Sequence, residues 1–584
     1  MTAPTIPARL FEQAQLRPTS PAYHVRGDDG WVDTNWADYA ANVRAVGQAL
    51  IAAGVEPGQV VCILGNNRPE WVEMDLAAMA VGAIPAGIYQ TCSPEEIGYI
   101  LNHAEAPIIL VENADQQAKV ESIRSELPHL KQIILMRGTD QSGDGTIGWD
   151  DFVASGSDIA PSDVDERVAQ LKPEASATFI YTSGTTGPPK AVMLTHDNLA
   201  WTAETACEII EYTDQDCGLS YLPLSHIAEQ MFTLHAPITG GGHVYFAESI
   251  EKMPDNLKEV QPTVFFGVPR VWEKFHAGVA AKLKLATGVK AKLVAFARRT
   301  GSEVVAKKNA NEPITGLLAF KYKLATKLIF SKLKPALGLG RARICVSGAA
   351  PIAPDVLNFM ASLDVTIHEV YGQSEDTGPT TFNLPGTTKF GSVGGRIPGV
   401  DVKIADDGEI LVKGRNVFKG YYKDEEATKA TLDADGWLYS GDLGTFDDDD
   451  YLVITGRKKD IIITAGGKNI APKNIEAALM EHPNVTQAVV IGDRRKFLSA
   501  ILAIDPEKVA EAGGKTEGFT DSIQAHVDAI NERFARVEHV RKFRLLPREL
   551  DLENSELTPT MKIKRRVVYE NWAELIETMY EEGA

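Results

Sequence analysis

Short apolar runs that alternate with helical stretches are the feature that most constrains the fold of this chain. Apolar residues recur at helical spacing over residues 36–53, and the unbroken apolar run over 60–64 that follows predicts a buried strand. A second helix is expected over 70–82, with further strands over 107–111 and 131–136. Strands and helices in this alternation predict an α/β fold with largely parallel sheets.

The length of the chain bears on its domain organisation. At 584 residues it exceeds what one hydrophobic core supports, so we expect two or more domains. After residue 385, short alternating runs separated by Gly and Asp turns predict a small β-rich, barrel-like subdomain over about 386–457. We therefore predict an N-terminal domain over 1–457 with two α/β sheets and this subdomain, a hinge at 458–460, and a small mobile α+β domain over 461–584. In the last domain a helix and two strands are expected near 472–481, 485–491 and 498–504.

Composition excludes several classes of protein. A formal net charge of -20 argues against a general nucleic-acid binder, because neutralising phosphates requires an excess of Lys and Arg. The five cysteines are scattered without a CxxC pair, which indicates neither a disulfide framework nor a thiolate zinc site and fits a reducing cytosol. The N-terminus lacks the features of a secretory signal, and no apolar run reaches about 18 residues. We therefore expect a cytoplasmic protein.

One segment carries charge of the opposite sign. From Lys274 to Arg343 there are sixteen Lys and Arg residues and two Glu residues. One reading is a set of solvated helix faces. The other is reversible contact with an anionic membrane surface, such as the inner membrane face, since Phe320, Leu324 and Leu328 form an apolar stripe at helical spacing. The lysines beside this stripe are Lys321, Lys323 and Lys327.

The sharpest local signal lies within residues 179–199. An apolar run ends in a loop rich in hydroxyl groups and glycines, and a second apolar run follows. Glycines let backbone N–H groups converge on an anion, and hydroxyl groups and a lysine add donors and charge. The loop is not a Walker A loop, because no GK[ST] ends it. Its candidate phosphate-binding residues are Thr182, Ser183, Gly184, Thr185, Thr186, Gly187 and Lys190.

Two further segments follow apolar runs. They are SGAAP over 347–351 and YGQSEDTGP over 371–379. Both are expected at strand ends, where open α/β sheets bind their ligands. Tyr371 offers an aromatic face, and Glu375 offers a carboxylate that could hold a metal ion.

Three segments in the last part of the chain, after residue 435, add charged groups. In GWLYSGDLG over 436–444, a tight turn places Asp442 where it could accept hydrogen bonds from ribose hydroxyls. The segment over 456–476 supplies Arg457 and a second Gly-rich turn, and LTPTMKIKRR supplies Lys562.

Together these segments resemble the adenylate-forming superfamily of acyl-CoA synthetases, luciferases and non-ribosomal adenylation domains. The resemblance covers almost the whole chain, with the motifs in the expected order. Within the superfamily, four segments look like long-chain and bubblegum-type fatty acyl-CoA synthetases: LPLSHIAEQ (222–230), GVPRVWEK (267–274), TAGGKNIAPKNIE (464–476) and GDRRKFLSAIL (492–502).

The resemblance implies a role for each candidate residue. The loop from Thr182 to Gly187 and Lys190 would bind the β- and γ-phosphates, and Thr185 and Glu375 would help hold Mg²⁺. Asp442 and Arg457 would bind the ribose. The residues implied at the adenine are Gly348, Ala349, Ala350, Tyr371 and Gly372. His226 would lie at the carboxylate of the acyl group, and Lys562 at the α-phosphate. Gly467 would line the pantetheine tunnel of coenzyme A.

Structural readings compete with these roles. Tyr371 could be a core aromatic residue, Glu375 could pair with a nearby arginine, and His226 could be a buried, satisfied histidine. Lys562 lies in a basic run, where most lysines are solvated. Gln373 stands where many relatives have Thr or Met, a departure that bears on the substrate class rather than on ATP use.

The function that the resemblance implies is ATP-dependent ligation of a long-chain fatty acid to coenzyme A through an acyl-adenylate, with Mg²⁺ as cofactor and release of AMP and pyrophosphate. Lys562, Glu375, Thr185 and His226 would be catalytic. The alternatives are a ligase for another carboxylic acid or a carrier-protein acceptor, a luciferase-like oxygenase, and a non-catalytic nucleotide-binding regulator. A regulator should have lost Lys562 or Glu375, and both are present.

A conflict between two implied roles predicts domain motion. Lys562 is needed at the α-phosphate during adenylation, whereas the turn at Gly466 and Gly467 is needed at the coenzyme A tunnel during thioester formation. Both cannot face one site at once, so we expect the C-terminal domain to rotate, with Lys459 as the hinge that the resemblance implies.

Overall fold

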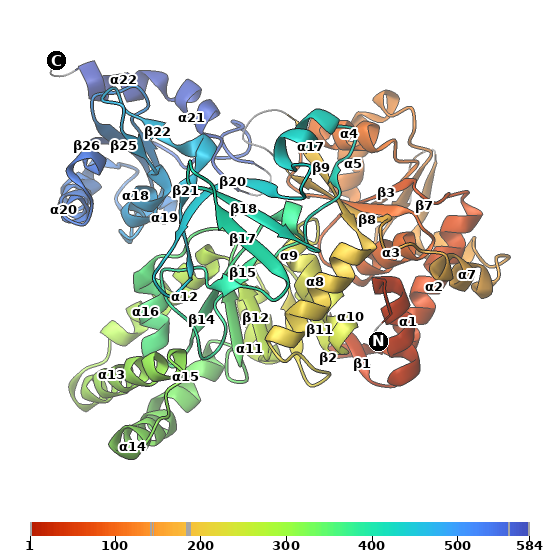
Figure 1. The fold of residues 1–584 in the computed structure, drawn as a ribbon, viewed down its shortest axis with the longest axis horizontal. Coiled ribbons are helices and arrows are strands. Elements are labelled where there is room, and N and C mark those ends of the chain that lie inside the picture. The colour runs from red at the N-terminus through yellow and green to blue at the C-terminus, as the bar shows by residue number, and fades with distance from the viewer. Residues whose placement is uncertain (1–2, 140–142, 144, 183–187, 559–560, 582–584) are drawn as a thin grey trace.

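The structure is a computed structural model that describes residues 3–139, 143, 145–182, 188–558 and 561–581. Figure 1 shows the N-terminal part of the chain on the right and below, and the C-terminal part at the upper left. The fold is α/β, as the sequence predicts, with helices packed on mixed sheets.

An eight-stranded sheet forms the largest layer. Its strand order is β19-β9-β8-β4-β3-β5-β6-β7, and the strands from β8 to β7 run parallel. The strands span Gly420–Tyr421 (β19), Lys190–Thr195 (β9), Ser176–Thr182 (β8), Ile84–Ile88 (β4), Val60–Leu64 (β3), Ile108–Val111 (β5), Gln132–Leu135 (β6) and Thr146–Gly148 (β7). Three of them are the strands predicted over 60–64, 107–111 and 131–136.

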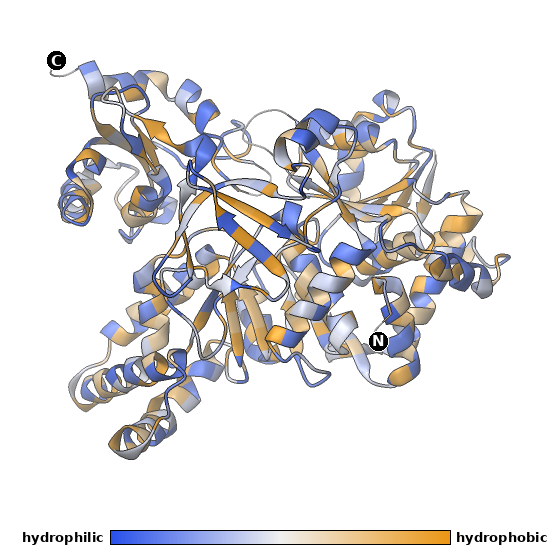
Figure 2. Cartoon of the chain, viewed as in Figure 1, coloured by the Kyte–Doolittle hydropathy of each residue, from blue (hydrophilic) through white to orange (hydrophobic). Residues whose placement is uncertain are grey.

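Helices cover both faces of this sheet, which explains why its central strands are apolar at every position. Val61 and Ile63 of β3 belong to the apolar cluster that contains α2 (Trp36–Ala52) and α3 (Pro69–Ala80). Val60, Cys62 and Leu64 belong to the cluster on the other face, with α4 (Pro94–Ala104) and α5 (Ala114–Ser122). A parallel strand buried on both faces has no solvent-facing position for a polar residue. Several strands of this sheet are accordingly coloured as strongly hydrophobic in Figure 2.

Three smaller sheets complete the N-terminal part. A five-stranded sheet has β12 (Val264–Gly267), β13 (Ile344–Ser347), β14 (Ile367–Tyr371), β15 (Thr381–Phe382) and β16 (Gly395–Arg396), of which the first three are parallel. An edge sheet has β10 (Cys217–Ser220), β11 (His243–Phe246), β1 (Pro21–Gly27) and β2 (Gly30–Asn35). An antiparallel sheet has β17 (Val400–Ile404), β18 (Glu409–Gly414), β20 (Leu438–Phe446) and β21 (Leu452–Arg457). Other helices of this part include α1 (Ile6–Leu16), α8 (His196–Ile209), α10 (Ala236–Gly240), α16 (Pro354–Ser362) and α17 (Glu425–Thr431).

The C-terminal part has apolar clusters of its own. Its sheet has β24 (Val485–Ile491), β25 (Leu498–Ile504) and β26 (Val540–Leu545), beside the hairpin of β22 (Ile462–Ile463) and β23 (Asn469–Ile470). Its helices include α18 (Pro472–Leu479), α20 (Thr520–Asn531), α21 (Arg565–Asn571) and α22 (Ala573–Glu581). The two buried apolar clusters of this part contain only residues between Ile462 and Met579. Both strands predicted here have the predicted bounds, and the helix ends two residues earlier than expected.

The basic segment forms a helical arm. We define the arm as α13 (Gly288–Asn309), α14 (Gly316–Ala325), η3 (Thr326–Phe330) and α15 (Ser331–Ala336), which follow α12 (Pro269–Lys284). Figure 1 shows α13 and α14 projecting from the sheets at the lower left. One buried carboxylate fastens the arm to the body: Asp364 accepts hydrogen bonds from Lys308 of α13 (2.8 Å), Tyr322 of α14 (3.0 Å) and Lys334 of α15 (3.4 Å). Among the described helices, none is long and apolar enough to cross a membrane.

Candidate functional site

Two of the predicted segments meet at the carboxyl ends of parallel strands. SGAAP begins at the last residue of β13, and YGQSEDTGP begins at the last residue of the neighbouring β14. Gly348 is packed tightly, since a Cβ there would lie 2.7 Å from Cγ1 of Val370. Ala349 has a φ of 67°, in the left-handed region that few non-glycine residues adopt. The chain therefore turns sharply where the resemblance places the adenine.

The loop after β14 depends on a glycine and a buried acid. A Cβ on Gly372 would lie 1.4 Å from the carbonyl oxygen of Gly378, so no other residue fits without moving the loop. Asp376 accepts hydrogen bonds from the backbone N–H of Gln373 (2.7 Å) and from the hydroxyl of Thr380 (2.6 Å). Burial raises the pKa of Asp376 to about 8. These contacts fix the short helix η4 (Ser374–Asp376) that carries Glu375.

Asp442 joins the two sheets at this point. It lies opposite Arg457 in the pairing of β20 with β21, and Nε of Arg457 lies 3.0 Å from its Oδ1. The hydroxyl of Tyr371 donates to Oδ2 of Asp442 (3.0 Å). Burial, followed by the charge of Asp442, raises the pKa of Tyr371 well above its usual value, so this hydroxyl stays a donor. Tyr371 is thus more than a core aromatic residue, because its hydroxyl belongs to a polar cluster with Asp442 and Arg457.

The ends of the candidate phosphate loop are held together by a hairpin. Thr182 at the end of β8 pairs with Lys190 at the start of β9. Nζ of Lys190 lies 3.6 Å from Oδ2 of Asp424 and 4.9 Å from the ring centroid of Tyr421. The rest of the predicted loop, which comprises Ser183, Gly184, Thr185, Thr186 and Gly187, lies outside the described residues.

Glu375 pairs with a tyrosine rather than with an arginine. Its Oε1 accepts a hydrogen bond from the hydroxyl of Tyr421 (2.8 Å), and its carbonyl oxygen accepts one from the N–H of Phe418 (2.8 Å). In the described part of the chain, no group of three or more His, Cys, Asp or Glu residues could hold a metal ion by itself. Mg²⁺ is commonly held by one or two carboxylates and the phosphates of a nucleotide, so a single carboxylate beside a phosphate loop fits this metal.

His226 is half buried at the start of the short helix α9 (Ile227–Gln230). Its Nδ1 accepts a hydrogen bond from the N–H of Ala228 (3.1 Å), which leaves the ring proton on Nε2. Burial, with a smaller contribution from the charge of Lys562, lowers the pKa of His226 to about 4. One ring nitrogen is therefore satisfied by the backbone, and the neutral ring can still donate from the other.

Lys562 reaches the same place from the far end of the chain. Its carbonyl oxygen and N–H bond to the N–H and hydroxyl of Thr558 (2.7 and 3.0 Å), which closes a tight loop. The side chain of Lys562 keeps exposed surface. Desolvation of the amine by the surrounding protein lowers its pKa, and the positive charges of Arg457 and Lys473 lower it further. Asp442 and Glu375 act in the opposite direction and raise it. Lys562 is thus close enough to Asp442 and Glu375 for their charges to act on its amine, while its side chain stays exposed to solvent.

Gly467 lies elsewhere. It is exposed at the tip of the hairpin of β22 and β23, with a φ of 72° and its N–H bonded to the carbonyl oxygen of Thr464 (2.8 Å). Within the described residues we find no contact that joins Gly467 to Lys562, Glu375 or Asp442. The structure therefore brings together Tyr371, Glu375, Asp442, Arg457 and Lys562, and leaves Gly467 outside this cluster.

Sequence reasoning missed three neighbours of the cluster. Tyr421 contacts both Glu375 and Lys190, Asp424 contacts Lys190, and the charge of Lys473 acts on Lys562. The signal for Tyr421 was the glycine and two tyrosines of the segment FKGYYKD, in which Gly420 has a φ of 137°. Nothing in the sequence indicates that this segment pairs with β9, more than two hundred residues earlier.

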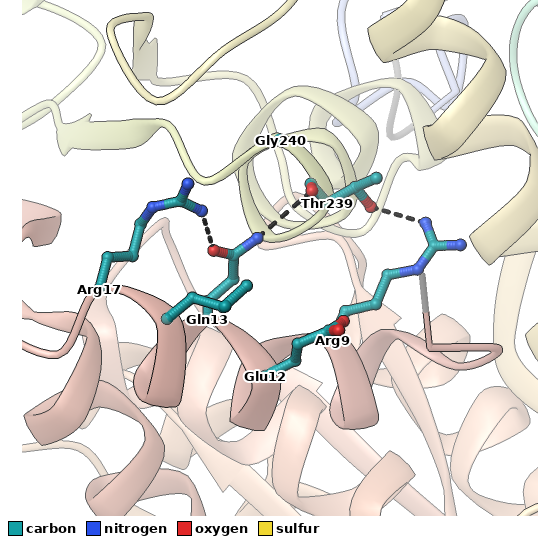
Figure 3. Close-up of a pocket in the computed structure, with 7 residues that line it drawn as sticks. Arg9, Glu12, Gln13, Arg17, Thr239 and Gly240 are labelled. Atoms are coloured by element: carbon teal, nitrogen blue, oxygen red, sulfur yellow. Dashed lines mark hydrogen bonds between the residues drawn. The ribbon is translucent and has the colours of Figure 1, made fainter. Parts of the chain in front are cut away.

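A separate cavity of about 310 Å³ opens between α1 and α10 (Figure 3). Gln13 donates to the carbonyl oxygen of Thr239 (3.3 Å), Arg9 donates to the hydroxyl of Thr239 (2.9 Å), and Arg17 donates to Gln13. These polar groups hold α1 on α10, and none of them belongs to the motifs above.

Comparison with known families and relatives gives a consistent result. The family model described as AMP-binding enzyme matches residues 10–422, and the model described as AMP-binding enzyme C-terminal domain matches residues 459–584. A long-chain-fatty-acid–CoA ligase of Xenopus laevis is 38% identical over 605 residues, covering 95% of this chain and 81% of the relative. A long-chain-fatty-acid–CoA ligase of Mycobacterium tuberculosis is 36% identical over 595 residues, covering 98% of this chain and 97% of the relative.

Solved structures show the same fold at lower identity. An anthranilate CoA ligase in complex with anthranoyl-AMP aligns with a TM-score of 0.74 at 21% identity, over 97% of each chain. The A domain of a carboxylic acid reductase from Segniliparus rugosus aligns with a TM-score of 0.77 at 18% identity, over 99% of this chain and 94% of that one.

The packing of Gly372 leads to a stability prediction. We expect Gly372→Ala to lower the free energy of unfolding by about 1–3 kcal/mol, the usual cost of overpacking, because the loop must move to admit the methyl group. Gly395→Ala is the matched control, since a Cβ at Gly395 meets nothing within 4 Å. Thermal melting of both variants measures the effect, and equal melting temperatures for the two would contradict the packing argument.

Proposed function

Because the chain belongs to the AMP-binding enzyme family, we propose that it joins a long-chain fatty acid to coenzyme A through an acyl-adenylate, with release of AMP and pyrophosphate. The observation that carries this proposal is the cluster in which Asp442 bonds to Tyr371 and to Arg457, both at 3.0 Å, while the charges of Asp442 and Glu375 act on Lys562. The substrate class is supported by relatives that are 34–38% identical over most of the chain and are named long-chain-fatty-acid–CoA ligases.

The first chemical difficulty is one of charge. A fatty-acid carboxylate must approach a triphosphate that repels it, so the site must supply positive charge around the phosphates. Lys190 and Lys562 would supply it, at the β- and γ-phosphates and at the α-phosphate respectively. The negative charge of a bound nucleotide would also raise the pKa of Lys562, which its present surroundings lower, and so favour the ammonium form.

The remaining residues of the cluster would hold the nucleotide. Tyr371 would lie against the adenine, and Asp442 with Arg457 would bind the ribose. Glu375 and Thr185 would hold Mg²⁺, which neutralises charge that develops on the phosphates. The Nε2–H of His226 would face the acyl carboxylate, and this ring stays neutral above a pH of about 4.

Two bond exchanges complete the reaction. A carboxylate oxygen bonds to the α-phosphorus while the bond from that phosphorus to pyrophosphate breaks. The thiolate of coenzyme A then bonds to the acyl carbon while the bond to AMP breaks, and the thiol proton passes to solvent. No nucleophile from the protein is required, and orientation of bound reactants can supply up to about 7–11 kcal/mol.

The nucleotide products test the proposal directly. With a long-chain fatty acid, coenzyme A and Mg²⁺, we expect ATP to yield AMP and pyrophosphate in equal amounts. Separation of the nucleotides by chromatography measures this, and a reaction without fatty acid is the control. ADP and phosphate as the main products would contradict the proposal.

We also propose that residues 461–584 rotate between the two half-reactions. The apolar clusters on the two sides of residue 460 are separate, and among the described residues no hydrogen bond joins residues 1–457 to residues 461–584. An ion pair (3.7 Å) joins Lys473 to Asp460, the last residue of the proposed hinge. Rotation would therefore break few of the polar contacts between described residues, and it would exchange Lys562 for the turn at Gly467.

Two variants separate the half-reactions. Lys562→Ala should reduce acyl-AMP formation by orders of magnitude and spare conversion of supplied acyl-AMP to acyl-CoA. Lys459 lies in the 3₁₀ turn η5 (Lys458–Asp460), and the φ typical of 3₁₀ turns is close to the value that proline fixes, so Lys459→Pro should hold the present orientation and lose thioester formation. Lys459→Ala is the control, because it removes the side chain and leaves φ free. The assays are pyrophosphate release without coenzyme A and acyl-AMP consumption with it; proportional loss of both in both variants would refute the alternation.

A finer proposal concerns the arm. The apolar stripe predicted from the sequence is exposed: Phe320 is 66% exposed, and Leu324 and Leu328 are each 39% exposed. The neighbouring Leu317 is also exposed, at 68%. The helix α14 ends at Ala325, so Leu328 continues the stripe in η3. Figure 2 shows hydrophilic and hydrophobic residues interleaved along the arm. Basic and apolar groups exposed together suit an anionic membrane surface, which also holds the water-insoluble substrate.

Sedimentation with vesicles tests the membrane proposal. We expect the protein to sediment with vesicles of phosphatidylglycerol and phosphatidylcholine at low salt and to be released at high salt, since screening weakens the attraction. Phe320→Ser should weaken binding severalfold. Leu16→Ser is the matched control, because Leu16 has the same 66% exposure and lies on α1. Vesicle binding that changes neither with salt concentration nor with Phe320→Ser would contradict the proposal.

A further inference from the structure

A tyrosine outside the predicted motifs lies between two parts of the candidate site. Tyr421 ends β19 and lies opposite Val192 of β9 in antiparallel register. It is 8% exposed. The preceding Gly420 has a φ of 137°, and a Cβ there would lie 2.7 Å from Cγ2 of Thr428. The backbone therefore fixes Tyr421 beside the strand that follows the candidate phosphate loop.

The hydroxyl of Tyr421 is committed to Glu375. It donates to Oε1 of that carboxylate at 2.8 Å. The neighbouring Phe418 donates its N–H to the carbonyl oxygen of the same glutamate, also at 2.8 Å, and the rings of Phe418 and Tyr421 meet edge to face at 4.9 Å. With Oε1 fixed in this way, Oε2 is the oxygen left to meet a cation.

The ring of Tyr421 is committed to Lys190. Nζ of Lys190 lies 4.9 Å from the ring centroid, within the range of a cation–π contact. The same amine lies 3.6 Å from Asp424, three residues further along the chain. One residue thus contacts both the carboxylate proposed for the metal and the lysine proposed for the phosphates.

We propose that Tyr421 is a positioning residue that orients Glu375 toward the Mg²⁺ of bound MgATP and holds Lys190 beside the phosphates. This inference rests on the proposed function, since it assumes that the site binds MgATP. Groups that hydrogen-bond to a metal ligand fix its orientation, and their loss commonly costs about 10–100-fold in metal affinity. Tyr421 acts through two other residues, so it need not touch the substrate.

The primary test measures binding without turnover. In calorimetric titrations of ATP in the absence of fatty acid, Tyr421→Phe should raise the Mg²⁺ concentration needed for half-maximal enhancement of ATP affinity by about 10-fold or more. Binding of ATP in EDTA should be unchanged, because the phenylalanine ring still supports Lys190. Tyr421→Leu removes the ring as well and should weaken ATP binding in EDTA by about two- to fivefold.

A neighbouring tyrosine supplies the matched control. Tyr422 packs its ring on Phe179, at 4.8 Å between centroids. The hydrogen bond that Oε1 of Glu375 accepts comes from the hydroxyl of Tyr421. Tyr422→Phe should therefore bind ATP with the wild-type dependence on Mg²⁺. Melting temperatures of all variants show whether each is folded at the temperature of the titration.

A double variant distinguishes positioning from a general structural role. In the Glu375→Gln background, Tyr421→Phe should cause no further change in Mg²⁺ dependence, whereas a structural defect would add its full effect. A wild-type Mg²⁺ dependence in Tyr421→Phe, or additive effects in the double variant, would overturn the inference. If the wild-type protein binds MgATP but forms no AMP, the proposed function fails while this binding test still stands.

Discussion

The carboxylate of Asp442 is the contact on which the arrangement of the site depends. Through its two oxygens it holds Tyr371 at the end of β14 and Arg457 at the end of β21. It thereby joins the five-stranded sheet to the antiparallel sheet at the point where the chain leaves for its C-terminal part. The charges of Asp442 and Arg457 also act on Lys562, in opposite directions, so the same pair sets the electrostatic surroundings of the residue that arrives from the far end.

The distribution of charge over the molecule matches the two anionic partners proposed above, a triphosphate and a membrane surface. The chain as a whole carries a formal net charge of -20, yet Arg457 and Lys473 act on Lys562 at the candidate site, Lys190 lies at the candidate phosphate loop, and the arm is strongly basic. A triphosphate and an anionic lipid surface would each meet positive charge locally on an acidic protein. In the arm the lysines are combined with exposed apolar side chains, whereas at the nucleotide site the cations are combined with Asp442 and Glu375.

The elements that were predictable from the sequence are those in which one local rule dominates. The all-apolar run of β3 predicted a buried strand, and the bounds of β24 and β25 followed from their apolar pattern. The positions of SGAAP and YGQSEDTGP followed from the apolar runs before them. The joining of Asp442 to Arg457 did not follow from any local rule, because it depends on the register between β20 and β21. Tyr421 was missed for the same reason, since the pairing of β19 with β9 joins distant segments.

In the orientation that the structure shows, residues from both parts of the chain form one candidate nucleotide site. A crystal structure with a non-hydrolysable acyl-sulfamate analogue of the adenylate would test it most directly. The account predicts the adenine against Tyr371, the ribose hydroxyls within hydrogen-bond distance of Asp442, and Nζ of Lys562 within that distance of the sulfamate that replaces the α-phosphate. An analogue bound away from Tyr371 and Asp442, or a Lys562 that contacts no part of it, would contradict the account.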